Sequence, residues 1–204
     1  MVLTLRSVEK IISYCEKNNY NLATNKGEIN IVYVEGMDAN GEVNSDLPNQ
    51  FNDVRIVLDC WLRTLGCWSA TTEPGRWYTE QPMNPKGAAR IAFGQYRAWR
   101  VGMHGSGADR HEALVQVAPV KVFRDANKDM IRTGDAIDEG LFGVNQHWGY
   151  DMPPSNIGKA SAGCLVGRSR TGHREFMNIV KTDPRYFADK NFIFSTIIIP
   201  GDKL

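Results

Sequence analysis

Short runs of β-branched and other apolar residues recur along this chain, and segments rich in glycine, proline, asparagine and aspartate separate them. Such runs, each closed by turn-forming residues, are typical of strands in a sheet. We expect strands at residues 29–34, 54–65, 114–123, 140–145 and 191–199. The third of these contains Pro119, which predicts a division into two short strands. The pattern therefore predicts a mainly β fold with a few helices.

The N-terminal segment has the spacing of an amphipathic helix instead. Residues 4–17 place Val8 and Ile11 on one face, and a polar stretch follows. We expect this segment to form a helical appendage at residues 1–28, ahead of one larger domain at residues 29–204.

Two later segments complete the expected outline. Residues 173–181 have helical spacing, with Thr171 or Gly172 available as the N-cap. Residues 68–86 are rich in proline, glycine and aromatic residues, so we expect a long ordered loop over the core. Its aromatic part at residues 73–78 could contact a glycan or a peptide, because loops often carry function.

The composition excludes some classes of partner. The chain has 24 lysines and arginines against 23 aspartates and glutamates, so its net charge of +1 predicts no nucleic-acid partner. No apolar stretch approaches the roughly 20 residues of a membrane span, so we expect no membrane insertion. The first residues lack the pattern of a signal peptide, which predicts synthesis as a soluble cytoplasmic protein. The four cysteines have no paired short spacing, so we expect free thiols.

One cysteine is a candidate nucleophile. Cys164 lies among small residues at positions 158–166, and His147 precedes it. Such a cysteine can occupy a tight turn in which the N–H groups of Gly163 and Cys164 face a substrate carbonyl. The thiolate is the reactive form, and His147 could generate it as a base. The alternative is a structural cysteine, because free cysteines are often buried.

The same residues carry a resemblance to a known family. The segment 140–149, which contains His147, and the sequence Ser161-Ala162-Gly163-Cys164 resemble the L,D-transpeptidase catalytic domain, also called the YkuD domain. The resemblance covers residues 113–170 and implies a β-sandwich or open barrel. It implies Cys164 as the nucleophile, His147 as the base, a backbone group near Trp148 that orients the histidine, and Ser161 and Gly163 as further catalytic residues.

The resemblance also implies a substrate. The Cys164 thiolate would attack an amide carbonyl of a peptidoglycan stem peptide, and the thioester would pass to an amine or to water. The residues expected to bind this substrate are Asn145, Trp148, Tyr150, Arg168 and Arg170. No cofactor or metal is implied, and the sequence does not predict the oligomeric state. Without a signal peptide, an enzyme acting on the cell wall is expected to be released or exported by another route, as a phage-type lysin or a toxin.

Two other functions remain open. The first is a zinc peptidase that uses His104, His111 or His147, although the glycines between the first two favour a mobile loop bordering the cleft. The second is a non-catalytic cell-wall-binding module. Ala162 stands where the family has a second histidine, and Val166 stands where it has a polar or basic residue.

Overall fold

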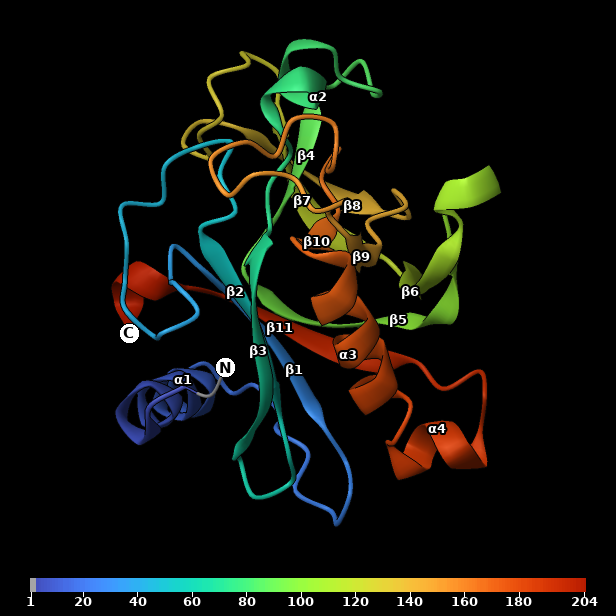
Figure 1. The fold of residues 1–204 in the computed structure, drawn as a ribbon. Coiled ribbons are helices and arrows are strands. Elements are labelled where there is room, and N and C mark those ends of the chain that lie inside the picture. Colours follow the sequence, from blue (N-terminus) through green and yellow to red (C-terminus); the bar gives the residue numbers. More distant parts are fainter. Residues whose placement is uncertain (1–2) are drawn as a thin grey trace.

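The computed structural model describes residues 3–204, and eight of its strands form a closed barrel (Figure 1). The strands follow one another around the barrel in the order β1 (Asn30–Glu35), β11 (Phe194–Pro200), β5 (Gly94–His104), β6 (His111–Gln116), β9 (Gln146–Trp148), β10 (Leu165–Gly167), β3 (Thr64–Thr71) and β2 (Asp53–Leu58). Neighbouring strands are antiparallel except for β1 with β11 and β9 with β10. The predicted mainly β fold is confirmed, but the sheet closes on itself instead of forming a sandwich or an open barrel.

A second, three-stranded sheet lies beyond one end of the barrel, in the upper part of Figure 1. Its antiparallel strands have the order β4 (Ala88–Ile91), β7 (Val120–Asp125) and β8 (Ala136–Gly140). The short helix α2 (Arg76–Glu80) precedes β4 and lies at the same end. The space between this sheet and the barrel end is where the candidate site is found.

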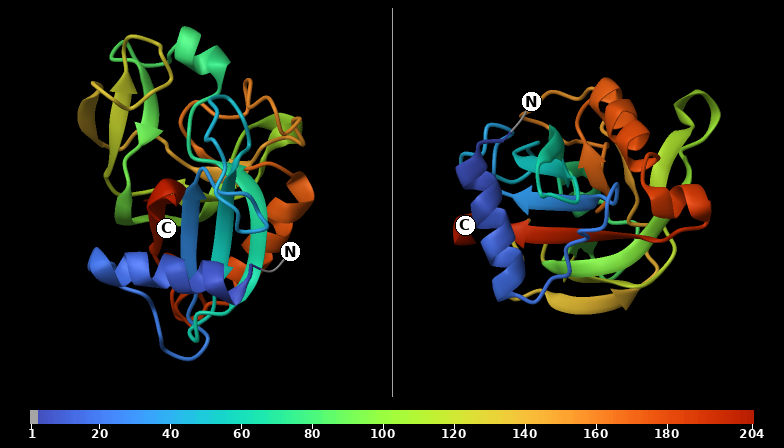
Figure 2. Two further views of the ribbon diagram at one scale, coloured as in Figure 1. Left: turned by 90° about the vertical axis from the view of Figure 1, so that its left-hand side faces the viewer. Right: turned by 90° about the horizontal axis from the view of Figure 1, so that it is seen from below.

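The helix α1 (Leu5–Lys17) lies across the outside of the barrel (Figure 2). Thr4 caps it, because its Oγ1 accepts the N–H of Ser7. Its buried side chains Val8 and Ile11 pack in one apolar cluster with outward-facing residues of β1, β2 and β11. The domain boundary at residue 28 stays a prediction.

The helix α3 (Arg170–Val180) covers another side of the barrel, and α4 (Pro184–Ala188) follows it. Phe176 of α3 belongs to the same core cluster as Trp99 and Leu165 of the barrel strands. The predicted caps are wrong, because Ser169 caps α3 by accepting the N–H of Gly172. None of the helices within residues 3–204 has the length and apolar character needed to cross a membrane.

Two expected elements differ between residues 54 and 86. The expected strand at 54–65 is two strands, because Asp59 forms a turn: its carboxylate accepts the N–H groups of Trp61 and Arg63. The expected loop at 68–86 is shorter, because β3 continues to Thr71 and α2 follows.

The expected strand at 140–145 is the third difference. Residues 141–145 form no strand, because the Gln116 side chain bonds with their backbone in place of a neighbouring strand. Its Oε1 accepts the N–H groups of Phe142 and Val144, and its Nε2 donates to the Gly140 carbonyl. The strand begins later, so His147 lies in the middle of β9 and not beyond a strand end.

Candidate active site

Cys164 and His147 line one cavity of about 610 Å³ at the barrel end. Its wall includes residues of the 141–144 and 159–164 segments, of β4 and β7, and Tyr78 of α2. The cavity is therefore formed by the barrel on one side and the three-stranded sheet on the other.

His147 lies on β9, and Cys164 immediately precedes β10, the parallel neighbour of β9. In their register Val166 of β10 pairs with His147 of β9, and the Leu165 N–H donates to the Asn145 carbonyl at 2.9 Å. Cys164 lies one residue before β10, in the turn that leads into the strand, and its side chain lines the same cavity as that of His147. The turn and the strand β9 therefore bring a thiol and an imidazole to one cavity.

A backbone hydrogen bond fixes the orientation of the His147 ring. Its Nδ1 lies 2.7 Å from the Trp148 carbonyl oxygen, which can only accept, so Nδ1 carries the proton. The lone pair of the neutral ring is then on Nε2. Burial lowers the pKa of His147 well below its usual value, and the neighbouring His104 adds to this effect. His147 is therefore a neutral base at pH 7.

A second histidine stacks on the first. The rings of His104 and His147 lie 3.9 Å apart at an angle of 8°. Asn145 fixes the His104 ring: its Oδ1 accepts the Gln116 N–H, so its Nδ2 donates to His104 Nδ1 at 3.0 Å. This bond leaves the His104 proton on Nε2. Burial, with His111 nearby, lowers the pKa of His104.

The turn before Cys164 is held by Ser161. Its Oγ accepts the Gly163 N–H at 3.1 Å and donates to the Cys164 carbonyl at 2.9 Å. The expected oxyanion contact from the Gly163 N–H is therefore wrong for this conformation, because that group is already bonded. The N–H of Cys164 itself is left as the backbone candidate.

The Cys164 thiol is half-buried at the edge of the cavity. Its Sγ lies 3.4 Å from the Gly143 carbonyl oxygen, to which it donates. Burial raises the pKa of this thiol to about 11, and a hydrogen bond from the Asn145 backbone partly offsets the rise. The resting cysteine is therefore a thiol that requires a base.

The expected substrate-binding residues lie in different places. Tyr150 lines the cavity, and Asn145 lies behind it, bonded to His104. The Trp148 ring stacks on His111 at 3.6 Å and borders a different hollow. Arg170 bonds with Asp151 at 2.7 Å.

Arg168 donates to the backbone carbonyl of Met152 at 3.2 Å. Neither Arg168 nor Arg170 lines the cavity. The cations that do line it are Arg124 and Lys159, which the sequence did not single out. Because they come from segments distant in the chain, only the folded structure brings them together.

The histidines of the metal alternative are placed unlike a ligand set. His104 ends β5 and His111 begins β6, so both histidines lie on strands, while the glycine-containing segment between them is a loop with a short 3-10 helix at Gly107–Asp109. His111 donates from Nδ1 to the Asp109 carbonyl at 2.6 Å, and its Nε2 faces the Trp148 N–H. Within residues 3–204, no three histidine, cysteine or acidic side chains converge as metal ligands would.

Comparisons of the chain with protein-family models, with curated proteins and with solved structures gave no match. The resemblance to L,D-transpeptidases therefore rests on the segments around His147 and Cys164, and it stays a prediction.

Proposed function

We propose that this protein is a cysteine-dependent acyl-transfer enzyme of the L,D-transpeptidase type, acting on peptidoglycan stem peptides. The observation that carries the proposal is that His147 of β9 and Cys164, in the turn just before the parallel strand β10, line one cavity, with His147 Nδ1 bonded to the Trp148 carbonyl. A thiol, an oriented neutral imidazole and an open cavity are what nucleophilic acyl transfer requires.

The reaction would begin with proton transfer from the Cys164 thiol to Nε2 of His147. The thiolate attacks the carbonyl carbon of the scissile amide, and the oxygen takes the electron pair while the Cys164 N–H stabilises it. The intermediate then collapses: the C–N bond breaks, the amine leaves with the proton from His147, and a thioester remains. An amine acceptor gives a cross-link and water gives hydrolysis, with His147 again acting as the base.

The experiment incubates the protein with purified peptidoglycan fragments and follows the products and the Cys164-containing peptide by mass spectrometry. We expect a thioester adduct on Cys164 in the wild type and no turnover in Cys164→Ala. We expect at least about a hundredfold loss of rate in His147→Gln, because general bases contribute on this scale. The matched control is Cys67→Ser, a buried cysteine of β3, which should keep the activity.

The products also separate the alternatives. New dimers indicate a transpeptidase, cleaved dimers an endopeptidase, and the loss of terminal residues a carboxypeptidase. Full activity in Cys164→Ala, with loss of activity on adding a chelator, would replace the proposal with a zinc peptidase. Binding to the fragments without any adduct or product would replace it with a wall-binding module.

A further inference from the structure

The cavity that contains Cys164 has a one-sided charge. Two cationic side chains, Arg124 and Lys159, belong to its wall, and no aspartate or glutamate of residues 3–204 lines it. A cavity with low-dielectric walls and charges of one sign attracts ligands of the opposite sign. The positive charge of the wall therefore favours a substrate that carries a negative charge.

Arg124 of β7 is built into this wall. Its side chain is 4% exposed, and its guanidinium lies 4.3 Å from the ring centre of Phe142, which also lines the cavity. One face of the group is bonded: Nε lies 3.1 Å from Asp138, and Nη1 donates to the Gly87 carbonyl at 3.5 Å. The remaining nitrogen, Nη2, is buried and has no hydrogen-bond partner within residues 3–204. Because Nη2 is closed to solvent, it does not face the open cavity, and Arg124 acts on a ligand there through its positive charge.

The acid beside Arg124 does not cancel the positive charge. Asp138 also pairs with Lys86, at 3.4 Å, so one carboxylate serves two cations. Arg124, Lys86 and Asp138 together therefore carry a net charge of +1.

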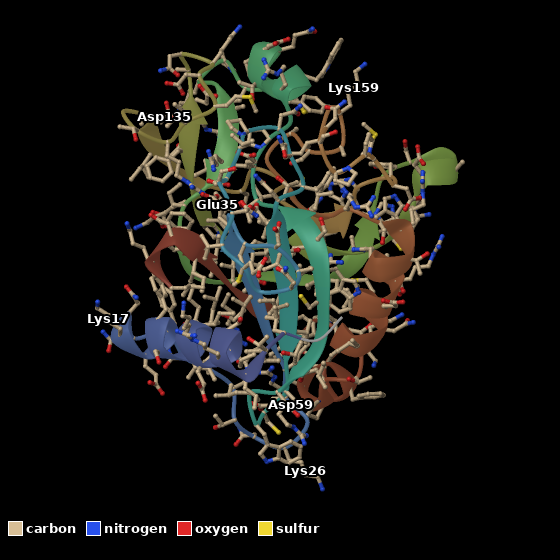
Figure 3. All side chains as sticks on the ribbon, turned by 60° about the vertical axis from the view of Figure 1, so that its left-hand side comes forward. Lys17, Lys26, Glu35, Asp59, Asp135 and Lys159 are labelled. Carbon is tan, nitrogen blue, oxygen red and sulfur yellow. The ribbon has the colours of Figure 1, made fainter. Side chains whose placement is uncertain are left out.

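Lys159 supplies the second cation, from the segment that leads to Cys164. It is exposed and lies near α2 in Figure 3. Its Nζ lies 3.8 Å from the centre of the Trp77 ring, a cation–π contact that positions the ammonium without neutralising it. Its charge is therefore available to a ligand in the cavity.

We propose that the cavity binds an acyl donor that carries a free carboxylate near the scissile carbonyl, and that Arg124 and Lys159 recognise this carboxylate. The inference rests on the proposed function for its acyl donor. The positive charge of Arg124 attracts a carboxylate into the cavity, and the exposed Lys159 ammonium can donate a charge-assisted hydrogen bond to it. A donor with a carboxamide there offers no charge, so the site discriminates between the two forms.

The first experiment needs no substrate. Iodoacetate and iodoacetamide alkylate the same thiolate, so the ratio of their rates at Cys164 reports the charge of the cavity and is independent of the thiol pKa. The rates are followed by mass spectrometry of the Cys164-containing peptide at low ionic strength. We expect the ratio of the iodoacetate rate to the iodoacetamide rate to fall at least about fivefold in Lys159→Gln and Arg124→Gln. Added salt should lower the wild-type ratio.

Two variants act as controls. Arg124→Lys keeps the charge and should keep most of the ratio, while Arg100→Gln removes an exposed cation of β5 that lies outside the cavity and should leave the ratio unchanged. If Arg124→Gln fails to fold, Lys159→Gln decides, because its side chain is exposed. A ratio in Lys159→Gln equal to that of the wild type would overturn the inference.

The second experiment compares thioester formation on two stem-type peptides that differ only in a free carboxylate or a carboxamide. We expect the carboxylate form to react at least about tenfold faster, and the preference to shrink in Lys159→Gln. Equal rates on both peptides overturn the inference and leave the proposed function intact. No thioester on either peptide rejects the proposed function, and the alkylation ratio then still decides the charge preference.

Discussion

At the scale of single residues, the stacked pair of His104 and His147 shows how backbone and amide groups select proton positions. The Trp148 carbonyl puts the His147 proton on Nδ1, and the Asn145 amide puts the His104 proton on Nε2. Both rings are neutral at pH 7, because burial lowers both pKa values, with His104 adding to the effect on His147 and His111 adding to the effect on His104. The site thus rests without an imidazolium to stabilise a thiolate.

A pH prediction follows for Cys164. With a thiol pKa of about 11, the thiolate fraction rises about tenfold for each pH unit below that value. We expect the rate of alkylation of Cys164 by iodoacetamide to rise with this slope from pH 7 to about pH 10. The measurement is the alkylation rate of the Cys164-containing peptide against pH. A plateau that begins below pH 8 would show instead a preformed thiolate–imidazolium pair.

The sequence identified some of the site residues and missed others for a physical reason. Cys164 and His147 lie in segments of recognisable composition, and the pairing of β9 with β10, which follows Cys164, brings them to one cavity. His104 and Arg124 reach the site from segments far from Cys164 in the chain, and Lys159, although it is close to Cys164 in sequence, lines the cavity only through the fold of the turn. No local pattern marks such contacts, so only the folded chain reveals them.

At the scale of elements, the turn at residues 161–164 joins the barrel to the three-stranded sheet. Gly163 has a φ of +120°, and a Cβ on it would lie 2.3 Å from the Ala89 carbonyl oxygen of β4. The turn therefore requires glycine both for its backbone conformation and for its close approach to β4. This approach places Cys164 in the cavity wall.

We expect Gly163→Ala to destabilise the protein by more than about 2 kcal/mol, because it adds a steric clash to a conformation that alanine disfavours. It should also reduce thioester formation, since the turn must move to relieve the clash. The measurement is the free energy of unfolding in denaturant. The matched control is Gly107→Ala, at a φ of +54° with no atom within 4 Å of the added Cβ, which should cost about 1 kcal/mol. Equal costs at the two positions would contradict the clash.

Elements were predictable where local composition decides them. The β-branched runs at 29–34 and 191–199 predicted strands that overlap β1 and β11, because both lie in the buried part of the barrel. Residues 141–145 were also expected to form a strand but do not, because the Gln116 side chain, from another part of the chain, accepts hydrogen bonds from their backbone N–H groups. One side chain can thus take over the backbone hydrogen bonds that a neighbouring strand would make, and local composition does not predict this.

At the scale of the whole molecule, a buried ion network connects the two sheets. Arg90 of β4 lies 3.0 Å from Glu35 of β1 and 3.3 Å from Glu73, and Arg132 also pairs with Glu35, which is labelled in Figure 3. The two arginines lower the pKa of Glu35 despite its burial, whereas burial raises the pKa of Glu73. The network holds the three-stranded sheet against the barrel end, so it supports the walls of the cavity.

We expect Arg90→Met to destabilise the protein by about 3–5 kcal/mol, because it leaves the buried Glu73 without its cation and Glu35 with Arg132 alone. The measurement is again denaturant unfolding. The matched control is Arg63→Met, which removes a solvent-exposed arginine paired with Asp59 and should cost less than about 1 kcal/mol. A cost below 1 kcal/mol for Arg90→Met would show that the network does not stabilise the fold.

The three-residue strand β9 links the assembly of the site to the folding order of the chain. The strand β9 pairs with β10 at three residue positions and with β6 at one, so His147 reaches its position only when these two strand pairings have formed. The barrel also requires β11 to pair with β1 and with β5, whose paired residues lie about 165 and about 100 positions away in the sequence. Pairings of such long range form late, because their loop-closure entropy is large. We therefore expect collapsed folding intermediates to lack acyl-transfer activity. The rate at which turnover recovers during refolding would then measure the rate at which β9 pairs with β6 and β10.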